Sequence, residues 1–275
     1  MLSYRHGFHA GSFADVHKHI ILVAILSYLQ KKAKPFSYID SHAGAGLYPI
    51  DLPYMQKTKE YANGIAKLFK QTPKNTLVQE YLSVIKQFNP TKELTIYPGS
   101  PLIAANFLNQ EDKMHALELH STDYPLLKQA LKIEKRAKVH NLNAYESLLA
   151  FLPPPAKRGL VMIDPSYEVK NEFQQVVELV KHAHKRFNTG IYAIWYPIVD
   201  RDISQKFVRA FKNAKIPNIL NSEICISADT PDYGMTGSGV LIINPPFTLH
   251  RDLQKSNQCL HEVLNLYSES VTKIA

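Results

Sequence analysis

The chain has 275 residues, of which 45% are hydrophobic and 20% are charged, and its formal net charge is +8 at pH 7. This composition excludes a disordered protein, and the length suits one large domain or a domain that carries an insertion. The positive charge favours a polyanionic partner such as a nucleic acid, although cations scattered along a chain are equally typical of solvated helix faces.

Two features of the sequence argue against a membrane or secreted protein. The longest apolar run, residues 20–26, is much shorter than the stretch of about 20 residues that crosses a bilayer. Cys225 and Cys259 are too few for a disulfide framework, and neither a Cys-x-x-Cys pair nor another regular ligand spacing predicts a metal site. We therefore expect a cytoplasmic protein with no metal, no membrane contact and no obligatory protein partner.

In chain order, the sequence predicts a helix over residues 15–30 and then short β-rich segments that alternate with helical patterns. The expected strands are residues 36–40, 114–118, 137–140, 159–164, 190–195, 222–226 and 239–243. The expected helices that follow the first strand are residues 60–70, 76–88, 124–135, 144–152, 171–187 and 203–214. This alternation predicts parallel βαβ units in a doubly wound α/β sheet of seven strands.

The interval between the first two strands is longer than one crossover helix requires. Most of the excess has helical spacing, with breaks at Pro73 and Pro90. We therefore expect residues 48–97 to form a small inserted helical subdomain, and residues 1–47 and 98–275 to form the main domain.

A ligand of an open α/β sheet binds beyond the carboxyl ends of the strands, so we expect the functional residues at these ends. The first strand ends in Asp40 and is followed by Gly44 and Gly46, which allow a backbone to approach a ligand closely. The loop lacks the third glycine of a dinucleotide fingerprint and the Gly-Lys-Ser/Thr of a P-loop, which disfavours hydride transfer and nucleotide hydrolysis. Glu118 ends the second strand, where it is either an acceptor for ribose hydroxyls or a solvated surface acid.

The fourth strand ends in Asp164-Pro165-Ser166-Tyr167. The exocyclic amine of adenine is a poor nucleophile, and a carboxylate together with the Pro165 carbonyl provides two acceptors that can orient it. Tyr167 can stack on an extruded base. The alternative is that Asp-Pro only starts a turn. Asn244-Pro245-Pro246-Phe247 fits the same pattern, but we expect it to end a strand near the edge of the sheet and not to be the catalytic turn.

A set of short motifs extends from residue 1 to about residue 247. They are Met1-Leu2-Ser3-Tyr4-Arg5-His6, Phe8-His9-Ala10-Gly11, Ala14-Asp15, Lys18-His19, residues 40–46, Tyr97-Pro98-Gly99-Ser100-Pro101, Glu118-Leu119-His120, Asp123-Tyr124-Pro125-Leu126-Leu127, Gly190-Ile191-Tyr192-Ala193, Trp195-Tyr196-Pro197 and Met235-Thr236. Together they resemble the RlmJ family of 23S ribosomal RNA adenine-N6 methyltransferases. The resemblance implies S-adenosylmethionine-dependent methylation of an adenine in 23S rRNA, on a Rossmann-like methyltransferase sheet with an inserted helical subdomain.

The resemblance also assigns roles to individual positions. It implies cofactor contacts at His19, His42, Ser100, Glu118, Asn143, Ala144 and Asp164. It implies the catalytic acceptor at Asp164, in a turn with Pro165 and Tyr167, and a substrate contact at Tyr4. Two positions depart from the family's pattern: Asn143-Ala144 stands where the family has Asp-Gly, and Ser166 stands where it has a second proline.

Two other functions use the same residues. A DNA adenine-N6 methyltransferase would need the same turn and the same cofactor loop. A non-catalytic nucleic-acid-binding protein, serving the use of external DNA, would need neither, and Ser166 and Asn143 would then mark a decayed site. The joint presence of Asp164, Tyr167 and Glu118 favours an active enzyme.

Overall fold

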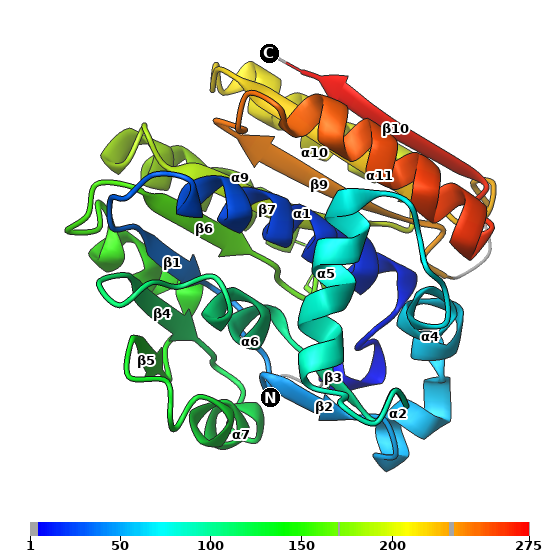
Figure 1. Ribbon diagram of the computed structural model, residues 1–275. Coiled ribbons are helices and arrows are strands. Elements are labelled where there is room, and N and C mark those ends of the chain that lie inside the picture. The colour runs from blue at the N-terminus through cyan, green and yellow to red at the C-terminus, as the bar shows by residue number, and fades with distance from the viewer. Residues whose placement is uncertain (1–4, 170, 231–233, 275) are drawn as a thin grey trace.

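A mixed sheet of eight strands forms the centre of the computed structural model, which describes residues 5–169, 171–230 and 234–274 (Figure 1). The strand order is β10-β8-β9-β7-β6-β1-β4-β5. The strands are β1 (Ser37–Asp40), β4 (Lys113–Leu117), β5 (Ala137–His140), β6 (Gly159–Ile163), β7 (Ile191–Ile198), β8 (Ile219–Cys225), β9 (Gly237–Ile243) and β10 (Ser268–Lys273). The seven strands expected from the sequence are all present, and the α/β class is confirmed.

The sheet differs from the expectation in two ways. β9 runs antiparallel to both β7 and β8, because the short connection from β8 has no room for the crossover that a parallel neighbour requires. The prediction of seven strands is also wrong by one, because β10 pairs antiparallel with β8 at the edge. Residues 268–273 are mostly polar and partly exposed, so no apolar alternation marks them as a strand.

Helices cover both faces of the sheet (Figure 1). On one face lie α1 (Phe13–Gln30), α5 (Thr76–Gln87), α6 (Ser100–Ala105) and α11 (Leu249–Leu264). On the other lie α8 (Ala144–Ser147), the 3-10 helix η2 (Leu148–Phe151), α9 (Glu172–Arg186) and α10 (Arg201–Asn213). The 3-10 helix η1 (His6–Phe8) precedes α1, and α7 (Asp123–Ala130) follows β4. No helix in the described ranges is long and apolar enough to cross a membrane.

Helix α1 is buried on nearly all sides. It packs on β6 and β9 and is covered by α5, α6 and α11, and fourteen of its eighteen residues are buried. The apolar side chains account for most of this burial, as expected for a helix that is hydrophobic all round. The polar residues His17, Lys18 and His19 are therefore carried into the interior as well.

The segment expected to form an insertion begins and ends in a two-stranded antiparallel ribbon. Its strands are β2 (Leu47–Pro49) and β3 (Ile96–Pro98). Between them lie α2 (Pro53–Thr58), α3 (Glu60–Asn63), α4 (Ile65–Phe69) and α5, and the last packs on α1. That residues 48–97 form a subdomain of their own stays a prediction.

The single helix expected over residues 60–70 is instead two short helices, α3 and α4, that meet at Gly64. A Cβ atom on Gly64 would lie 2.2 Å from the carbonyl oxygen of Gly11, and the amide of Ile65 donates to that same oxygen at 2.9 Å. This close backbone approach breaks the helix and attaches the insertion to the segment before α1.

Replacement of Gly64 by alanine tests this contact. We expect Gly64→Ala to lower the free energy of unfolding by about 1–3 kcal/mol, because the added methyl group meets backbone that cannot move aside easily. The neighbouring exposed residue provides the control, and Asn63→Ala should stay within about 0.5 kcal/mol of the wild type. Urea unfolding of the three proteins measures the difference, and equal stability would contradict the proposed close approach.

Candidate active site

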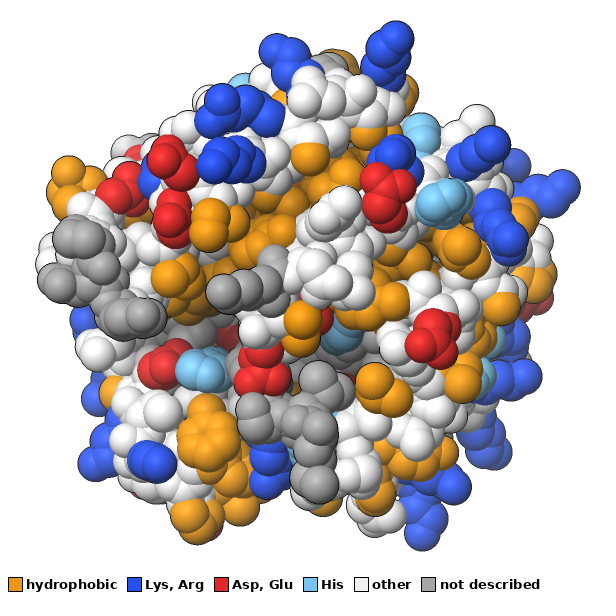
Figure 2. Space-filling view, turned by 180° about the vertical axis from the view of Figure 1, so that it is seen from behind, with side chains coloured by type: hydrophobic (Ala, Val, Ile, Leu, Met, Phe, Trp, Pro, Cys, Tyr) orange, Lys and Arg blue, Asp and Glu red, His pale blue; other side chains and the backbone are white. Residues whose placement is uncertain are grey.

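A cavity of about 460 Å³ opens where the segments that follow β1, β4, β5 and β6 meet. The predicted site residues that line it are His19, His42, Ser100, Glu118, Asn143, Ala144 and Asp164. Pro165 and Tyr167 belong to the same turn as Asp164 but are not part of the lining, and Tyr4 lies outside the described residues. Figure 2 shows Asp, Glu and His side chains around a hollow in the middle of the face seen from behind, with Lys and Arg mainly toward its margin.

The loop after β1 approaches the cavity with its backbone. Gly44 has φ 62°, and a Cβ atom there would lie 2.3 Å from the hydroxyl oxygen of Tyr48. That hydroxyl accepts a hydrogen bond from the Ala45 amide at 3.0 Å. Glycine is thus required at position 44 both by its left-handed conformation and by the tyrosine packed against it.

Glu118 is held by two backbone donors. Its Oε2 accepts from the Gly44 amide and its Oε1 from the His120 amide, both at 2.7 Å. Burial raises the pKa of the carboxyl group, although both hydrogen bonds oppose this shift. An ionised carboxylate can accept about four hydrogen bonds, so the fixed group retains acceptor capacity for a ligand hydroxyl.

Two apolar side chains that sequence reasoning missed line the cavity next to Glu118. Leu119 is 46% exposed and Leu142 is 40% exposed. Leucine side chains this exposed at a concave site suit an aromatic ligand surface. Each follows the end of a strand by only a few residues, and this position in the sequence could have identified both leucines as cavity residues.

Asn143 caps the short helix α8. Its Oδ1 accepts from the Tyr145 amide at 3.0 Å, and its Nδ2 donates to Glu146 at 3.1 Å. These two partners determine the orientation of the Asn143 amide, and the neighbouring Ala144 is buried. An aspartate at this position could make the same capping bond, so the departure from the family's pattern preserves the cap.

The two predicted histidines are neutral, polar parts of the cavity wall. Burial lowers the pKa of His19 to about 3 and that of His42 to about 4. The Nδ1 of His19 lies 2.7 Å from the Tyr97 hydroxyl, and that of His42 lies 2.7 Å from the Ser41 hydroxyl. Among the described residues, no group of three or more His, Cys, Asp or Glu side chains is placed to hold a metal ion.

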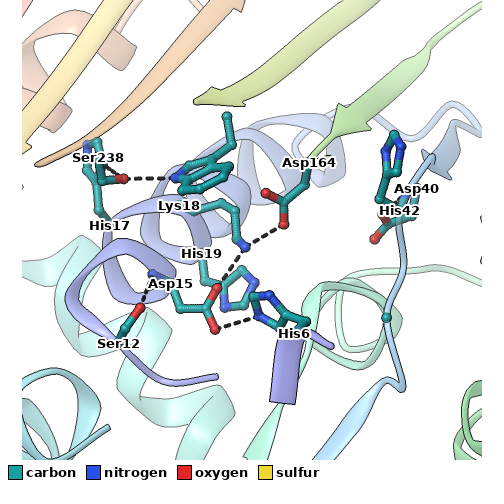
Figure 3. Close-up of polar contacts among 12 residues, drawn as sticks. His6, Ser12, Asp15, His17, Lys18, His19, Asp40, His42, Asp164 and Ser238 are labelled. Atoms are coloured by element: carbon teal, nitrogen blue, oxygen red, sulfur yellow. Dashed lines mark hydrogen bonds and ion pairs between the residues drawn. The ribbon is translucent and has the colours of Figure 1, made fainter. Parts of the chain in front are cut away.

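Asp164 is paired with a lysine that sequence reasoning did not identify as functional. The Lys18 ammonium lies 2.5 Å from Asp164 Oδ2 and 2.7 Å from Asp15 Oδ1, between the two carboxylates (Figure 3). The other oxygen of Asp15 is contacted by His6 Nε2 and by the Gly11 amide, each at 2.9 Å. This network connects α1 to the turn that follows β6.

The opposite charges of the network stabilise the ionised forms of one another. Burial alone would lower the pKa of Lys18, but Asp15 and Asp164 outweigh it and raise that pKa above its ordinary value. Burial alone would likewise raise the pKa of Asp15, but His6 and Lys18 hold it well below the usual range. The available signal in the sequence was an Asp-x-x-Lys pair inside an otherwise apolar helix.

Tyr167 is part of an aromatic cluster behind the turn. It has φ 55°, its hydroxyl donates to the Trp195 carbonyl at 2.7 Å, and its ring centre lies 4.3 Å from that of Phe173. The Trp195 ring in turn lies 5.7 Å from the Lys18 ammonium. These contacts hold a left-handed backbone that only glycine adopts easily. That Tyr167 stacks on a target base stays a prediction.

The turn that begins at Asn244, the alternative to the Asp164 turn, does not lie at the cavity. Because β9 is antiparallel, Asn244 is at the opposite end of the sheet from Asp164, as the arrowheads of β9 and β6 show (Figure 1). Asn244 follows β9, which is the third strand from the β10 edge of the sheet and lies between β8 and β7. The Asn244 side chain donates to the carbonyls of Asn188 and Gly190, both at 2.8 Å.

A buried polar network lies beneath Lys18. The Trp195 indole donates to the Ser238 hydroxyl at 3.0 Å. His17 lies beside Ser238, 3.2 Å from its hydroxyl oxygen (Figure 3), and its other ring nitrogen lies 2.8 Å from the Ser222 hydroxyl. Because an indole can only donate, the Ser238 hydroxyl proton is free to bond His17 Nδ1, and His17 Nε2 then donates to Ser222. Burial accordingly lowers the pKa of His17 to about 3.

The neutral state of His17 predicts a pH dependence of stability. A histidine whose pKa is lowered on folding stabilises the fold above its unfolded pKa of about 6.5, and this contribution is lost as the pH falls toward the folded value. Between pH 6 and pH 5, the stability of the wild type should therefore fall relative to that of His17→Gln by about 1.4 kcal/mol per pH unit. Urea unfolding measures this difference. The exposed His182→Gln should follow the wild type, and a His17→Gln profile parallel to the wild type would contradict the assignment.

Comparisons with known proteins identify the family of the chain. The family model described as "Ribosomal RNA large subunit methyltransferase D, RlmJ" matches residues 33–272. "Ribosomal RNA large subunit methyltransferase J" from Escherichia coli is 42% identical over 264 residues, which cover 96% of this chain and 94% of that protein. The protein of the same name from Haemophilus influenzae is 43% identical over 256 residues, 93% of this chain and 91% of that one. A crystal structure from Legionella pneumophila is similar with a TM-score of 0.88, 38% identity and coverage of 96% and 97%. The chain therefore belongs to the RlmJ family of ribosomal RNA large subunit methyltransferases.

Proposed function

We propose that this protein transfers a methyl group from S-adenosylmethionine to the N6 amine of an adenine in 23S ribosomal RNA. The observation that carries the proposal is the Asp164 carboxylate, held by Lys18 in the same cavity as Gly44 and Glu118. The names of the family and of its relatives support a ribosomal RNA substrate.

The cavity fits the cofactor. S-adenosylmethionine supplies an electrophilic methyl group on a positively charged sulfur. Glu118 offers acceptors for the ribose hydroxyls, and Leu119 and Leu142 offer apolar walls for the adenine. Glu172 Oε2 is buried without a hydrogen-bond partner in the described part of the chain, and the same residue lines the cavity, so an acceptor remains for a donor group of the ligand.

Asp164 orients the target amine. Lys18 occupies Oδ2, so Oδ1 is left to accept a hydrogen from the amine, and the Pro165 carbonyl is the second acceptor. Both acceptors turn the nitrogen lone pair toward the methyl donor. Catalysis then depends mainly on positioning, because no strong base is needed to start the transfer. Tyr167 and Tyr4 are proposed to contact the substrate base.

The double-stranded parts of a ribosomal RNA are recognised mainly through phosphates, 2′-hydroxyls and A-form shape. The helical insertion has six exposed lysines that suit phosphate contacts, namely Lys57, Lys59, Lys70, Lys74, Lys86 and Lys92. Localisation in the cytoplasm and independence from a protein partner belong to the same proposal.

The first test removes the catalytic acceptor, because the one amide oxygen of an asparagine would be taken by Lys18 and its NH2 group, a donor, would face the target amine. Asp164→Asn should leave cofactor binding within a few fold but lower the methyl transfer rate by roughly a hundredfold or more, because it loses an interaction made mainly in the transition state. Calorimetry measures cofactor binding, and incorporation of labelled methyl groups into 23S rRNA measures transfer. The exposed Asp51→Asn is the control and should be as active as the wild type. Full activity of Asp164→Asn would contradict the assignment.

The second test compares RNA with DNA. If 2′-hydroxyls and A-form geometry are recognised, protein-free 23S rRNA fragments should accept labelled methyl groups far better than DNA of the same sequence. The same concentrations of both substrates are compared at one salt concentration, because phosphate contacts make binding salt-dependent. A preference for DNA, or equal labelling, would favour the DNA adenine methyltransferase.

A further inference from the structure

The turn that resembles the catalytic one has an exposed aromatic ring that neither the fold nor the proposed active site uses. Phe247 is 96% exposed, directly after Pro245-Pro246. The turn is well fixed, because Asn244 has φ 54°, its amide donates to the Asn218 carbonyl at 3.0 Å, and its side chain makes two more hydrogen bonds. A large apolar side chain is thus presented to solvent on a stiff support.

Two cavities flank this turn, one of about 620 Å³ and one of about 370 Å³. Tyr28 and Pro246 line both of them, so the cavities adjoin at the turn. We call the two cavities together with Phe247 the basic groove. Six exposed cations line it: Lys31, Lys32, Lys34, Lys157, Arg251 and Lys255.

The charge of the basic groove is strongly positive. Among the described residues, its lining includes just two acids, Glu80 and Asp252. A further cation, Arg158, donates to the carbonyls of Leu29 and Lys34, which holds the lysine-bearing segment between α1 and β1 in place. Arg251 is paired with Asp252 at 3.6 Å, and the cations still outnumber the acids, so the groove has a fixed wall and an excess of positive charge.

The active-site cavity has the opposite character. The one Lys or Arg in its described lining is Lys18, which is already paired with two carboxylates. Acids predominate there, among them Glu118, Asp123 and Glu146. The rim of that cavity therefore offers little attraction to the phosphates of a long RNA, and binding of such a substrate requires cations elsewhere on the surface.

We propose that the basic groove binds a segment of RNA distant from the target adenine, with phosphates on its lysines and an unpaired base stacked on Phe247. A basic groove with an exposed aromatic ring is the combination that binds single-stranded nucleic acid. The groove lies at the end of the strands opposite to the end that carries Asp164, so the two sites are roughly 20 Å apart by the length of the strands. That the polyanion is RNA rests on the proposed function.

The experiment uses the full chain and a full-length 23S rRNA transcript free of protein. Phe247→Ala should weaken binding at least about fivefold, the smallest effect expected from the loss of one stacked base. Replacement of Lys32, Lys34 and Lys255 by alanine should make the slope of log affinity against log salt shallower by about 2 to 3, because each lost phosphate contact contributes roughly 0.7–0.9.

Matched surface variants provide the controls. Ile133 is 91% exposed, so Ile133→Ala removes an equally exposed apolar side chain, and Lys132, Lys135 and Lys138 provide an exposed lysine triple outside the groove. Calorimetric binding of S-adenosylmethionine should be unchanged in all four variants. The proposal would be overturned if the groove variants bound the transcript with the affinity and salt slope of their controls. That result would favour an acidic protein as the partner of the groove.

The same transcript separates this proposal from the proposed function. If the wild type transfers methyl groups to the transcript while the groove variants bind it like their controls, only the groove assignment fails. If no methyl group is transferred but the groove variants lose affinity, the groove remains an RNA site and the proposed reaction fails.

Discussion

The buried Lys18 ammonium is the interaction on which the site depends. A charge in the interior is tolerated only when it is paired, and here it lies between Asp15 on its own helix and Asp164 at the end of β6. The ion pair between Lys18 and Asp164 requires α1 to lie in one position on the sheet. The apolar residues that surround α1 on all sides stabilise this position. His6, from before the helix, contacts Asp15, so the N-terminal segment becomes part of the same network.

The helical insertion is tied to the same helix. His19 lies 2.7 Å from the Tyr97 hydroxyl, which lies 3.1 Å from that of Tyr81, so a chain of hydrogen bonds runs from the candidate active-site cavity into β3 and α5. Gly64 contributes a second attachment through the Gly11 carbonyl. In the proposed function the insertion thus has two roles, since it contacts RNA on its exposed side and holds α1 on its buried side.

Local signals in the sequence were enough for most of the fold. Apolar runs such as residues 159–164 identified the central strands, and the acids at their ends located the cavity. Strand β10 was missed because a polar edge strand has no apolar alternation, and the break at Gly64 depends on a contact with distant backbone. The role of Lys18 was missed because its partner Asp164 is 146 residues away in the chain. The resemblance supplied His19, Ser100 and Asn143, which no spacing rule would single out.

Comparison of N6-methyladenine in 23S rRNA from cells with and without this protein tests the central claim most directly. We expect one adenine that is methylated in the presence of the protein and unmethylated in its absence. Methylation should return with the wild-type chain and fail to return with Asp164→Asn. Identical methylation maps from both kinds of cell, or restoration by the Asp164→Asn chain, would contradict the account.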